Sequence, residues 1–445
     1  MEQRTDPSVL PGGPESQSLP ARQVDLGRFG RNFLAMLSLT AAFGATGAGA
    51  HPLNLERGAV PEDCGACFAG PGQAQFLGSQ AVAPLEQGTA PQQPGQQPGD
   101  KPATKPHLEI GSEDDTVIAN AFPGLIDTSA QEARLMGAGV ERVIVYPKAV
   151  FGHKLKQDDA AVKSATDKGM SVYMTLAGNG VHWADRKFER YVTTTVKHYD
   201  KLGVRFYGLI NEPNFGSWLY PMPGKTRAQT YRELYVDDGY PAVKSQAKKD
   251  GVDDKVAAFE TSSERQPLQF MKAVLACTPS GSVSCAPLIT DMVAYHPYTL
   301  TSSPNKPCDP SGDIGFACLP LIDNLIQAEY DAGKLQTPDG QKPDLGFTEF
   351  AYEVQSGSAS GTRAHGRYIL DRTRSLFYQR DLQLACDDPN VKMLVFYGRE
   401  SSPALQSKNE PKQWNSALIR PNGKPDKSYD TIQSFSADHP ECVVR

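Results

Sequence analysis

Two glutamates in this chain stand at the ends of apolar runs that have the length of a β-strand. The run Val204–Ile210 ends at Asn211-Glu212-Pro213-Asn214, and a second run from Leu345 ends at Glu349. Proline lacks the N–H group that a central strand needs, so the first strand must stop there and present its polar groups at an open rim. Carboxylates on two separate strands can act as an acid and a nucleophile, which is the pairing that cleaves glycosidic bonds.

Other apolar runs indicate the fold that positions these glutamates. The predicted strands are Leu108–Gly111, Val143–Tyr146, Ser171–Leu176, Val204–Ile210, Val256–Glu260, Asp291–Tyr295, Leu345–Glu349 and Lys392–Tyr397. Most show little polar alternation, as expected for parallel strands that helices cover on the outside. Eight strands alternating with helical segments predict an α/β fold, a (β/α)8 TIM barrel, with a doubly wound open sheet as the alternative.

Local signals place helices between the strands. Ser129-Ala-Gln-Glu132 has the pattern of a capping box and predicts the start of the first helix. The apolar residues of Phe188–Leu202 keep a three-to-four spacing and stop at Gly203, a typical helix C-cap. Gly169 and Gly251 are expected to end two further helices in the same way.

A barrel of this kind places its active site at the carboxyl ends of the strands. Polar residues collect there in this sequence. The fourth strand ends in Asn211 and Glu212, the sixth runs into His296-Pro297-Tyr298, and the seventh ends in Glu349. Because several strands end in residue types that one reaction needs, we expect a shared site.

Aromatic residues near the same strand ends are candidate platforms for sugars, because apolar ring faces pack on the C–H faces of a sugar. The candidates are Trp183, next to His182 after the third strand, Trp218 after the fourth and Tyr397 at the eighth. For Trp218 and Tyr220, packing within the rim is an equal alternative.

The sequence resembles the clan A glycoside hydrolases, which are retaining (β/α)8 glycosidases, over most of residues 108–436. The matching motifs are Ile210-Asn-Glu-Pro-Asn214, Tyr295-His-Pro-Tyr298 and Thr348-Glu-Phe350. The segment Trp414–Pro425 is similar to the stretch that leads such barrels into their last helix. Within the clan, the sequence is most similar to family 39 and related bacterial proteins.

The resemblance implies a role for each matching residue. Glu212 would be the general acid/base, and Glu349 the nucleophile that forms a glycosyl-enzyme intermediate. Asn211 would bond the 2-OH of the sugar, Tyr298 would lie against Glu349, and His296 would be a structural or subsite residue. A retaining pair must lie ~5–5.5 Å apart, with the pKa of the acid raised and that of the nucleophile kept low.

Other readings of the carboxylates stay open. Glu212 or Glu349 could be a strand-end residue paired with a neighbouring Arg or Lys, and Glu353 is a competing nucleophile. Glu260 could line the site or form a salt bridge. The run Glu113-Asp114-Asp115 could bind sugar hydroxyls or a cation, or lie in a solvated loop, and we assign no metal and no cofactor.

Two positions depart from the clan pattern. Many members have an arginine near the end of strand two, where this chain has Tyr146-Pro-Lys148, while Arg142 is expected at the start of that strand. Many also have a tryptophan at the end of strand eight, where this chain has Phe396-Tyr-Gly-Arg399. Both positions contact the sugar in relatives, so the identity of the sugar stays open, as does exo or endo action.

Composition limits the partners. Of the 445 residues, 39% are apolar, which is enough for a large core. A formal net charge of −6 and a pI near 5.8 provide no basic surface for nucleic acid. We therefore expect no nucleic-acid partner. The motifs above indicate a carbohydrate as the partner, and we expect a monomeric protein with no lectin-like second domain.

The first 50 residues have the pattern of a secretory signal peptide. Arg28 and Arg31 precede the short apolar stretch Phe33–Phe43, and small residues follow to Ala50. An uncleaved membrane anchor is the alternative. Residues 51–107 are rich in Pro, Gly and Gln and are expected to be a disordered segment or linker, followed by the barrel at 108–436 and a tail at 437–445.

Eight cysteines fit an exported protein. By proximity, the expected disulfides join Cys277 to Cys285, Cys308 to Cys318, Cys386 to Cys442 and Cys64 to Cys67. The last pair could be read as a redox or metal pair, but no second pair or nearby histidine supports that reading.

These patterns together predict a secreted retaining glycoside hydrolase, possessing a signal peptide, that acts on a polysaccharide or oligosaccharide. Two other classes remain open. One is a catalytically inactive barrel that binds glycan at the cell surface, and the other is a barrel enzyme of different chemistry, such as a lyase or a metal-dependent hydrolase.

Overall fold

The computed structural model describes residues 105–115, 118, 123–178, 182–183, 187–276, 285–299, 303–305, 307–308, 314–354, 369–399, 416–420 and 423–444. The predicted signal peptide, nearly all of the predicted linker, Cys64, Cys67, Cys277 and Trp414 lie outside these residues.

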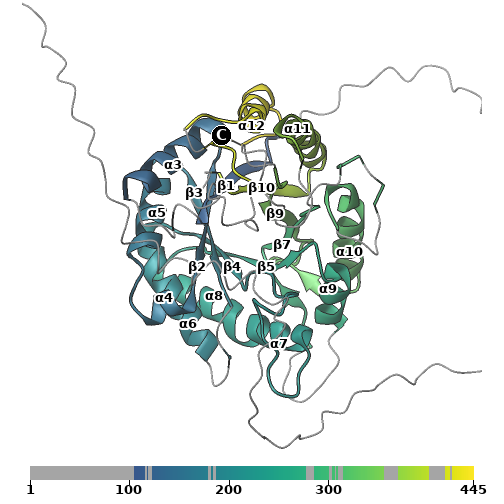
Figure 1. The fold of residues 1–445 in the computed structure, drawn as a ribbon. Helices are drawn as coiled ribbons and strands as arrows, with labels where there is room; N and C mark the ends of the chain where they lie inside the picture. The colour runs from purple at the N-terminus through teal and green to yellow at the C-terminus, as the bar shows by residue number, and fades with distance from the viewer. Residues whose placement is uncertain are drawn as a thin grey trace, which may run out of the picture. The chain divides into compact units, whose positions relative to one another are not determined.

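Eight parallel strands form a closed barrel with helices around it (Figure 1). The strands of the barrel are β1 (Glu109–Glu113), β2 (Val140–Val145), β3 (Ser171–Leu176), β4 (Phe206–Leu209), β5 (Lys255–Ser262), β7 (Met292–His296), β9 (Asp344–Phe350) and β10 (Val391–Tyr397). Their order is β1-β10-β9-β7-β5-β4-β3-β2, and a separate two-stranded sheet joins β6 (Leu288–Ile289) to β8 (Leu335–Gln336). The TIM barrel and all eight of its predicted strands are confirmed, and closure rules out the open sheet.

Helices follow the strands and cover the outside of the barrel. They are α3 (Pro123–Met136), α4 (Pro147–Phe151), α5 (Lys156–Asp167), α6 (Lys187–Tyr199), α7 (Arg227–Glu233), α8 (Tyr240–Asp250), α9 (Pro267–Ala276), α10 (Leu319–Asp331), α11 (Asp371–Asp387) and α12 (Lys427–Asp438). Three short helical turns lie at Asp200–Leu202, Leu234–Gly239 and Phe316–Cys318.

The helix signals in the sequence were mostly right. In α6 the spaced apolar residues are buried, and Gly203 has a φ of 90°, the left-handed conformation that a C-cap glycine adopts. Gly251 ends α8 with a φ of 70°. The predicted capping box at Ser129 is wrong, because α3 begins six residues earlier, at Pro123. Ser129 lies inside that helix, and its hydroxyl bonds Asp114 at 3.3 Å instead.

A small hydrophobic cluster fills the interior of the barrel at the amino-terminal side. Its buried members are Val140, Tyr173, Ala257, Met292, Ala294, Met393 and Val395. Side chains two residues further along a strand point to the same face. Arg142 therefore lies above Val140 on β2, and Thr175 above Tyr173 on β3. The apolar layer thus supports a polar layer at the mouth.

The predicted disulfides are confirmed where the structure describes both cysteines. Cys308 joins Cys318, and Cys386 in α11 joins Cys442 near the C-terminus. Cys285 is in a disulfide, but its expected partner lies outside the described residues. Within the described part of the chain, no helix is long and apolar enough to cross a membrane.

Candidate active site

Irregular backbone aims Glu212 into the mouth of the barrel. The residue follows β4 with a φ of 41°, and Ile210 before it has a φ of 71°. A β-branched residue rarely adopts this left-handed conformation, so the local structure must hold it in place. The backbone N–H of Glu212 donates to the carbonyl of Glu260 on β5 at 3.0 Å, which ties the two strand ends together.

Bulges reshape two further strands at the same level. On β5 the register to β7 shifts between Phe259 and Thr261, and Phe259 has a φ of 82°. The N–H of Phe259 donates to the buried hydroxyl of Tyr231 on α7 at 2.5 Å. On β9 the register to β10 shifts next to Glu349, between Phe347 and Phe350. Bulges re-aim side chains and occur near active sites.

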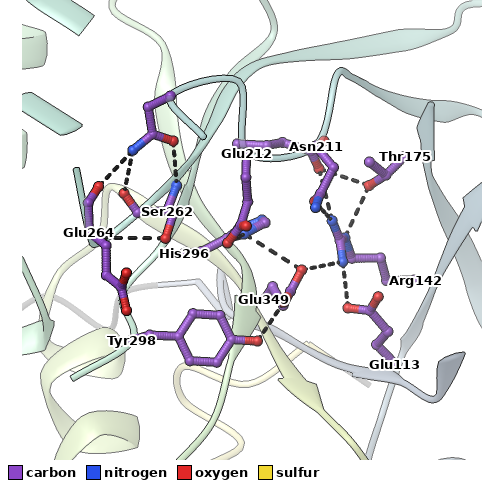
Figure 2. Close-up of polar contacts among 12 residues, drawn as sticks. Glu113, Arg142, Thr175, Asn211, Glu212, Ser262, Glu264, His296, Tyr298 and Glu349 are labelled. Atoms are coloured by element: carbon purple, nitrogen blue, oxygen red, sulfur yellow. Dashed lines mark hydrogen bonds and ion pairs between the residues drawn. The ribbon is translucent and has the colours of Figure 1, made fainter. Parts of the chain in front are cut away.

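The two glutamates meet at His296 (Figure 2). The Nδ1 atom of His296 lies 3.4 Å from Glu212 Oε1 and 3.5 Å from Glu349 Oε2. One carboxylate oxygen of each glutamate and a ring nitrogen of His296 all lie within 4.8 Å of one another. The histidine is fully buried, while 15% of the Glu212 side chain and 12% of the Glu349 side chain stay exposed. The carboxyl groups therefore reach the mouth, and the imidazole lies beneath them.

A buried arginine connects the polar layer. Arg142 donates to Glu349 Oε2 at 2.8 Å, to Glu113 Oε2 at 2.5 Å and to Asn211 Oδ1 at 2.7 Å (Figure 2). Its Nε donates to Thr175 at 3.0 Å. Burial alone would lower the pKa of Arg142, but the carboxylates around it raise that pKa well above its ordinary value. The guanidinium therefore stays charged and holds both Glu349 and Asn211.

Glu349 is held at both oxygens. Arg142 donates to Oε2, and the hydroxyl of Tyr298 donates to Oε1 at 2.6 Å. The Tyr298 ring contacts His296 and Tyr397 edge-on, with centroids 6.4 and 6.5 Å away. A carboxylate fixed in this way has little freedom to turn out of the mouth.

Glu212 has a different electrostatic environment. Burial raises its pKa to about 7, while the charge of Arg142 and hydrogen bonds from Ser262 and Trp218 lower it and the charge of Glu260 raises it. A substantial fraction of Glu212 is therefore protonated at neutral pH. Such a carboxyl group can donate a proton and later accept one.

His296 is a neutral hydrogen-bond donor in this arrangement. Burial lowers its pKa to about 4, although the charge of Glu349 works in the opposite direction. Its Nδ1 faces two carboxylate oxygens, so the tautomer that carries the proton on Nδ1 fits best. A cation at these three side chains would lie beside the guanidinium of Arg142, which already bonds Glu349 Oε2. We therefore place no metal there.

The structure brings six of the eight predicted site residues together at the mouth. They are Asn211, Glu212, His296, Tyr298, Glu349 and Tyr397. Trp218 lies at the rim beside them, half-buried and stacked on Tyr146. Trp183 is different. Its ring is 3% exposed and packs against Phe188 and Tyr191, with centroids 4.9 and 5.6 Å away. This burial argues against a role for Trp183 as a sugar platform.

The structure also places two carboxylates whose role the sequence left open. Glu113 ends β1 with no exposed surface, so the solvated-loop reading is wrong for this residue. Glu260 is also buried and accepts from Tyr173 at 2.7 Å and Thr175 at 2.8 Å. A Cβ on Gly208 of β4 would come within 2.6 Å of that carboxyl group, so only glycine leaves room for it.

Sequence reasoning missed Arg142 as a site residue. The prediction began β2 at Val143, three residues too late, so Arg142 was expected before the inward-facing part of the strand. The signal lay in the sequence Val140-Glu-Arg-Val-Ile-Val145, where a charged pair interrupts an apolar strand. A buried charge must be paired, so such an interruption indicates a polar partner inside the fold. Tyr146 at the rim was predicted as the end of this strand but not as a site residue.

Comparisons with known proteins show the fold. No protein-family model matches the sequence, and no curated protein matches it. A solved family 39 glycoside hydrolase from the gut symbiont Bacteroides cellulosilyticus has a TM-score of 0.55 and 15% identity, over 75% of this chain and 64% of that one. The chain thus spans less than two thirds of that protein.

A second group of solved structures is similar over most of its length. A GH5_18 protein from Bifidobacterium longum subsp. longum has a TM-score of 0.50 and 14% identity, over 76% of this chain and 80% of that one. A variant of it in complex with Manβ1-4GlcNAc has a TM-score of 0.51 at 14% identity, with 75% and 78% covered. The expected resemblance to clan A glycoside hydrolases, family 39 among them, is confirmed at the level of the fold.

Proposed function

We propose that this protein is a retaining glycoside hydrolase in which Glu349 is the nucleophile and Glu212 the general acid/base. The observation that carries the proposal is the meeting of these two carboxyl groups at His296. One oxygen of each lies within 4.8 Å of the other, which favours the ~5–5.5 Å separation of retaining carboxyl pairs over the ~6.5–9.5 Å of inverting ones.

The first step would form a covalent intermediate. Glu349 attacks the anomeric carbon, the glycosidic C–O bond breaks, and the proton of Glu212 moves to the departing oxygen. Glu349 can attack because Arg142 and Tyr298 fix its two oxygens. The raised pKa of Glu212 keeps a proton available for the departing oxygen near neutral pH.

The second step would release the sugar. Glu212, now ionised, takes a proton from water, the water oxygen bonds the anomeric carbon, and the ester bond to Glu349 breaks. Esterification removes the negative charge of Glu349, and the loss of a nearby like charge favours the ionised form of Glu212. One glutamate therefore suits both the acid and the base roles.

The neighbours of the pair would orient the sugar. Asn211 accepts from Arg142 through its Oδ1, which directs the amide nitrogen of the same side chain away from the guanidinium. This nitrogen could donate to the 2-OH of the sugar, as the clan resemblance implies. Tyr397, edge-on to Tyr298, would contact the same sugar ring.

The charges favour an uncharged sugar. Arg142 is fully buried and contacts protein oxygens with all three of its nitrogens. Asp115 lies near enough to Glu349 for the two carboxylates to repel each other. A sugar carboxylate at the mouth would therefore face acidic groups, so we propose neutral polysaccharides or oligosaccharides as substrates.

We also propose that the protein is secreted. The predicted signal peptide and the disulfides Cys308–Cys318 and Cys386–Cys442 support this, because disulfides persist in oxidising compartments.

Trapping with 2-fluoro glycosides tests the function. A panel of gluco-, manno-, xylo- and galacto-configured 2-fluoro glycosides is incubated with the protein, and peptide mass spectrometry identifies the modified residue. We expect one member to label Glu349 and to abolish turnover of the matching glycoside. A protein that binds oligosaccharides of these four sugars but hydrolyses none would be the inactive glycan-binding barrel, and hydrolysis with labelling at Glu353 would reassign the nucleophile.

A further inference from the structure

Four rings lie along one part of the rim, and we call Tyr146, His182, Trp218 and Tyr220 the rim aromatics. Tyr146 directly follows β2, and His182 lies in the segment after β3. Trp218 and Tyr220 lie in the segment after β4, six and eight residues beyond Glu212. Three neighbouring strands therefore contribute rings to one side of the mouth.

The rim aromatics form two stacked pairs. The Tyr146 and Trp218 rings have centroids 6.4 Å apart and planes inclined by 27°. The His182 and Tyr220 rings have centroids 5.3 Å apart, with the same inclination. Tyr146 is 37% exposed and Tyr220 43%, so each pair reaches the surface. Trp183, one residue from His182, is buried instead, so not every aromatic residue of this segment lies at the rim.

Trp218 lies against the proposed acid. The backbone N–H of Phe215 donates to the carbonyl of Glu212 at 2.8 Å and that of Trp218 to the carbonyl of Phe215 at 3.2 Å, so a tight turn keeps Trp218 beside Glu212, and the Trp218 side chain lowers the Glu212 pKa. The backbone oxygen of Trp218 also lies over Gly178, just after β3, where a Cβ would come within 2.8 Å of it. The chain after β4 thus crosses the end of β3 and brings the Trp218 ring between Glu212 and Tyr146.

Tyr146 faces the same mouth. Burial raises the pKa of its hydroxyl, and the charges of Asp115, Glu113 and Glu349 raise it further. The hydroxyl therefore keeps its proton and can donate to a sugar oxygen. An aromatic face with a hydroxyl donor at its edge is suited to a carbohydrate, which has apolar C–H faces and polar edges.

We propose that the rim aromatics bind the leaving-group side of a carbohydrate chain, with one sugar on the Trp218–Tyr146 pair and a second on the Tyr220–His182 pair. This inference rests on the proposed function, because it needs Glu212 to protonate the glycosidic oxygen. The sugar beyond that oxygen is the leaving group, and Trp218 is the ring that the turn after Glu212 brings beside that residue. Tyr220 is two residues further along and paired with a different ring, so it meets the next sugar.

The inference predicts the size of the substrate. The protein should prefer chains with two or more sugars on the leaving-group side, because each stacked sugar adds binding energy that can be used in the transition state. Stacking contacts of this type change affinity by about tenfold each. Short substrates that leave the rim empty should react more slowly.

The test uses whichever of glucose, mannose, xylose and galactose the wild type hydrolyses. Two substrates of that sugar are compared, a glycosyl fluoride and a tetrasaccharide. The glycosyl fluoride releases an ion too small to touch the rim, and the tetrasaccharide fills it. For each variant the kcat/KM on the tetrasaccharide is divided by that on the fluoride. We expect this ratio to fall about tenfold in Trp218→Ala, at least threefold in Tyr220→Ala, and less in Trp218→Phe, which keeps a ring.

Tyr330→Ala is the matched control, because Tyr330 lies on α10, in a different part of the fold. Its ratio should equal that of the wild type. An unchanged ratio in both Trp218→Ala and Tyr220→Ala would overturn the inference and leave the proposed function intact. Hydrolysis of a fluoride without hydrolysis of any tetrasaccharide would do the same. A wild type inactive on every fluoride and every tetrasaccharide would instead overturn the proposed function.

Discussion

The two ends of the barrel both hold carboxyl groups whose pKa values are raised to about 7, yet only one end resembles a site. At the mouth, burial raises the pKa of Glu212. At the amino-terminal ends of the strands, burial and the neighbouring charge of Asp200 raise the pKa of Asp254. By pKa alone, the two groups would be equal candidates for acid/base chemistry.

Their surroundings differ. Asp254 is fully buried, and neither of its carboxyl oxygens has a hydrogen-bond partner among the described residues. Arg205 lies 4.0 Å from it and 3.8 Å from Asp200. Glu212 is 15% exposed and lies beside a second carboxylate that an arginine and a tyrosine hold in place. A raised pKa therefore indicates function only where the group can reach a substrate and a reaction partner.

The largest effect should come from the nucleophile. Glu349→Gln removes the attacking oxygen but keeps the shape of the side chain, so we expect kcat to fall by at least ~10⁴-fold. Steady-state kinetics on the sugar identified by trapping measures this. Asp254→Asn is the matched change at the other end of the barrel, and its kcat should stay within about twofold of wild type. Equal losses in the two variants would remove the distinction between the two ends.

Loss of the acid should have the next largest effect. In Glu212→Ala, kcat/KM for substrates with sugar leaving groups should fall by about 10³-fold, because no proton reaches the departing oxygen. The loss should be smaller for a glycosyl fluoride, which needs little protonation. Added azide should restore turnover and yield a glycosyl azide, because it attacks the intermediate without a general base. Absence of both the leaving-group dependence and the azide product would contradict the assignment.

The pH dependence of kcat/KM also distinguishes Glu212 from Asp254. Glu212 must be protonated to act as an acid, and burial raises its pKa to about 7. The kcat/KM of the wild type should therefore fall as pH rises through about 7. That limb should be absent in Glu212→Ala and unchanged in Asp254→Asn. A limb that persisted without Glu212 would assign the titration to another group.

A third change addresses the arginine of the mouth. Arg142→Met leaves Glu113 and Glu260 buried without the charge that pairs with them. Removal of one partner from a buried ion pair costs about 3–5 kcal/mol of unfolding free energy. Urea unfolding at pH 7 measures the loss. Arg205→Met, at the partly exposed arginine of the other end, should cost less than about 1 kcal/mol. Similar losses of unfolding free energy in the two variants would contradict the role of Arg142 as the buried arginine that connects the polar layer.

The smallest effect concerns stability at the amino-terminal end. The pKa of Asp254 is about 7 in the folded protein, against an ordinary value of 3.8, so the folded state binds more protons between these values. Its contribution to stability is present at low pH and is lost as pH rises towards about 7. Asp254→Asn should remove this loss, so the variant should gain stability relative to wild type between pH 4 and pH 7. Parallel unfolding curves for the two proteins over that range would contradict this.

The sequence predicted the eight strands because each is a short apolar run. Such a run can be recognised locally, without knowing which strands it pairs with. It also predicted Glu212 and Glu349, because each ends such a run. The same reasoning placed Gly203 at the end of a helix.

The sequence could not show which side chains turn inward where strands are irregular. The prediction started β2 at Val143, and that three-residue error hid Arg142. The bulges in β5 and β9 depend on hydrogen bonds between distant residues, such as Phe259 with Tyr231, that no local pattern reveals. Trp183 was chosen for its type, but burial against Phe188 depends on how the segment packs on α6. Long-range contacts decided these cases.

The pairing of β1 with β10, which closes the barrel, affects the order in which the protein can fold. β1 pairs with β10, and Leu108 pairs with Val443, so the first strand has to wait for the last residues of the chain. The disulfide from Cys386 to Cys442 links that terminal segment to α11. A ribosome produces the N-terminal part first, so β1 remains without one neighbour until β10 has been made. The barrel can therefore close only after β10 has been made.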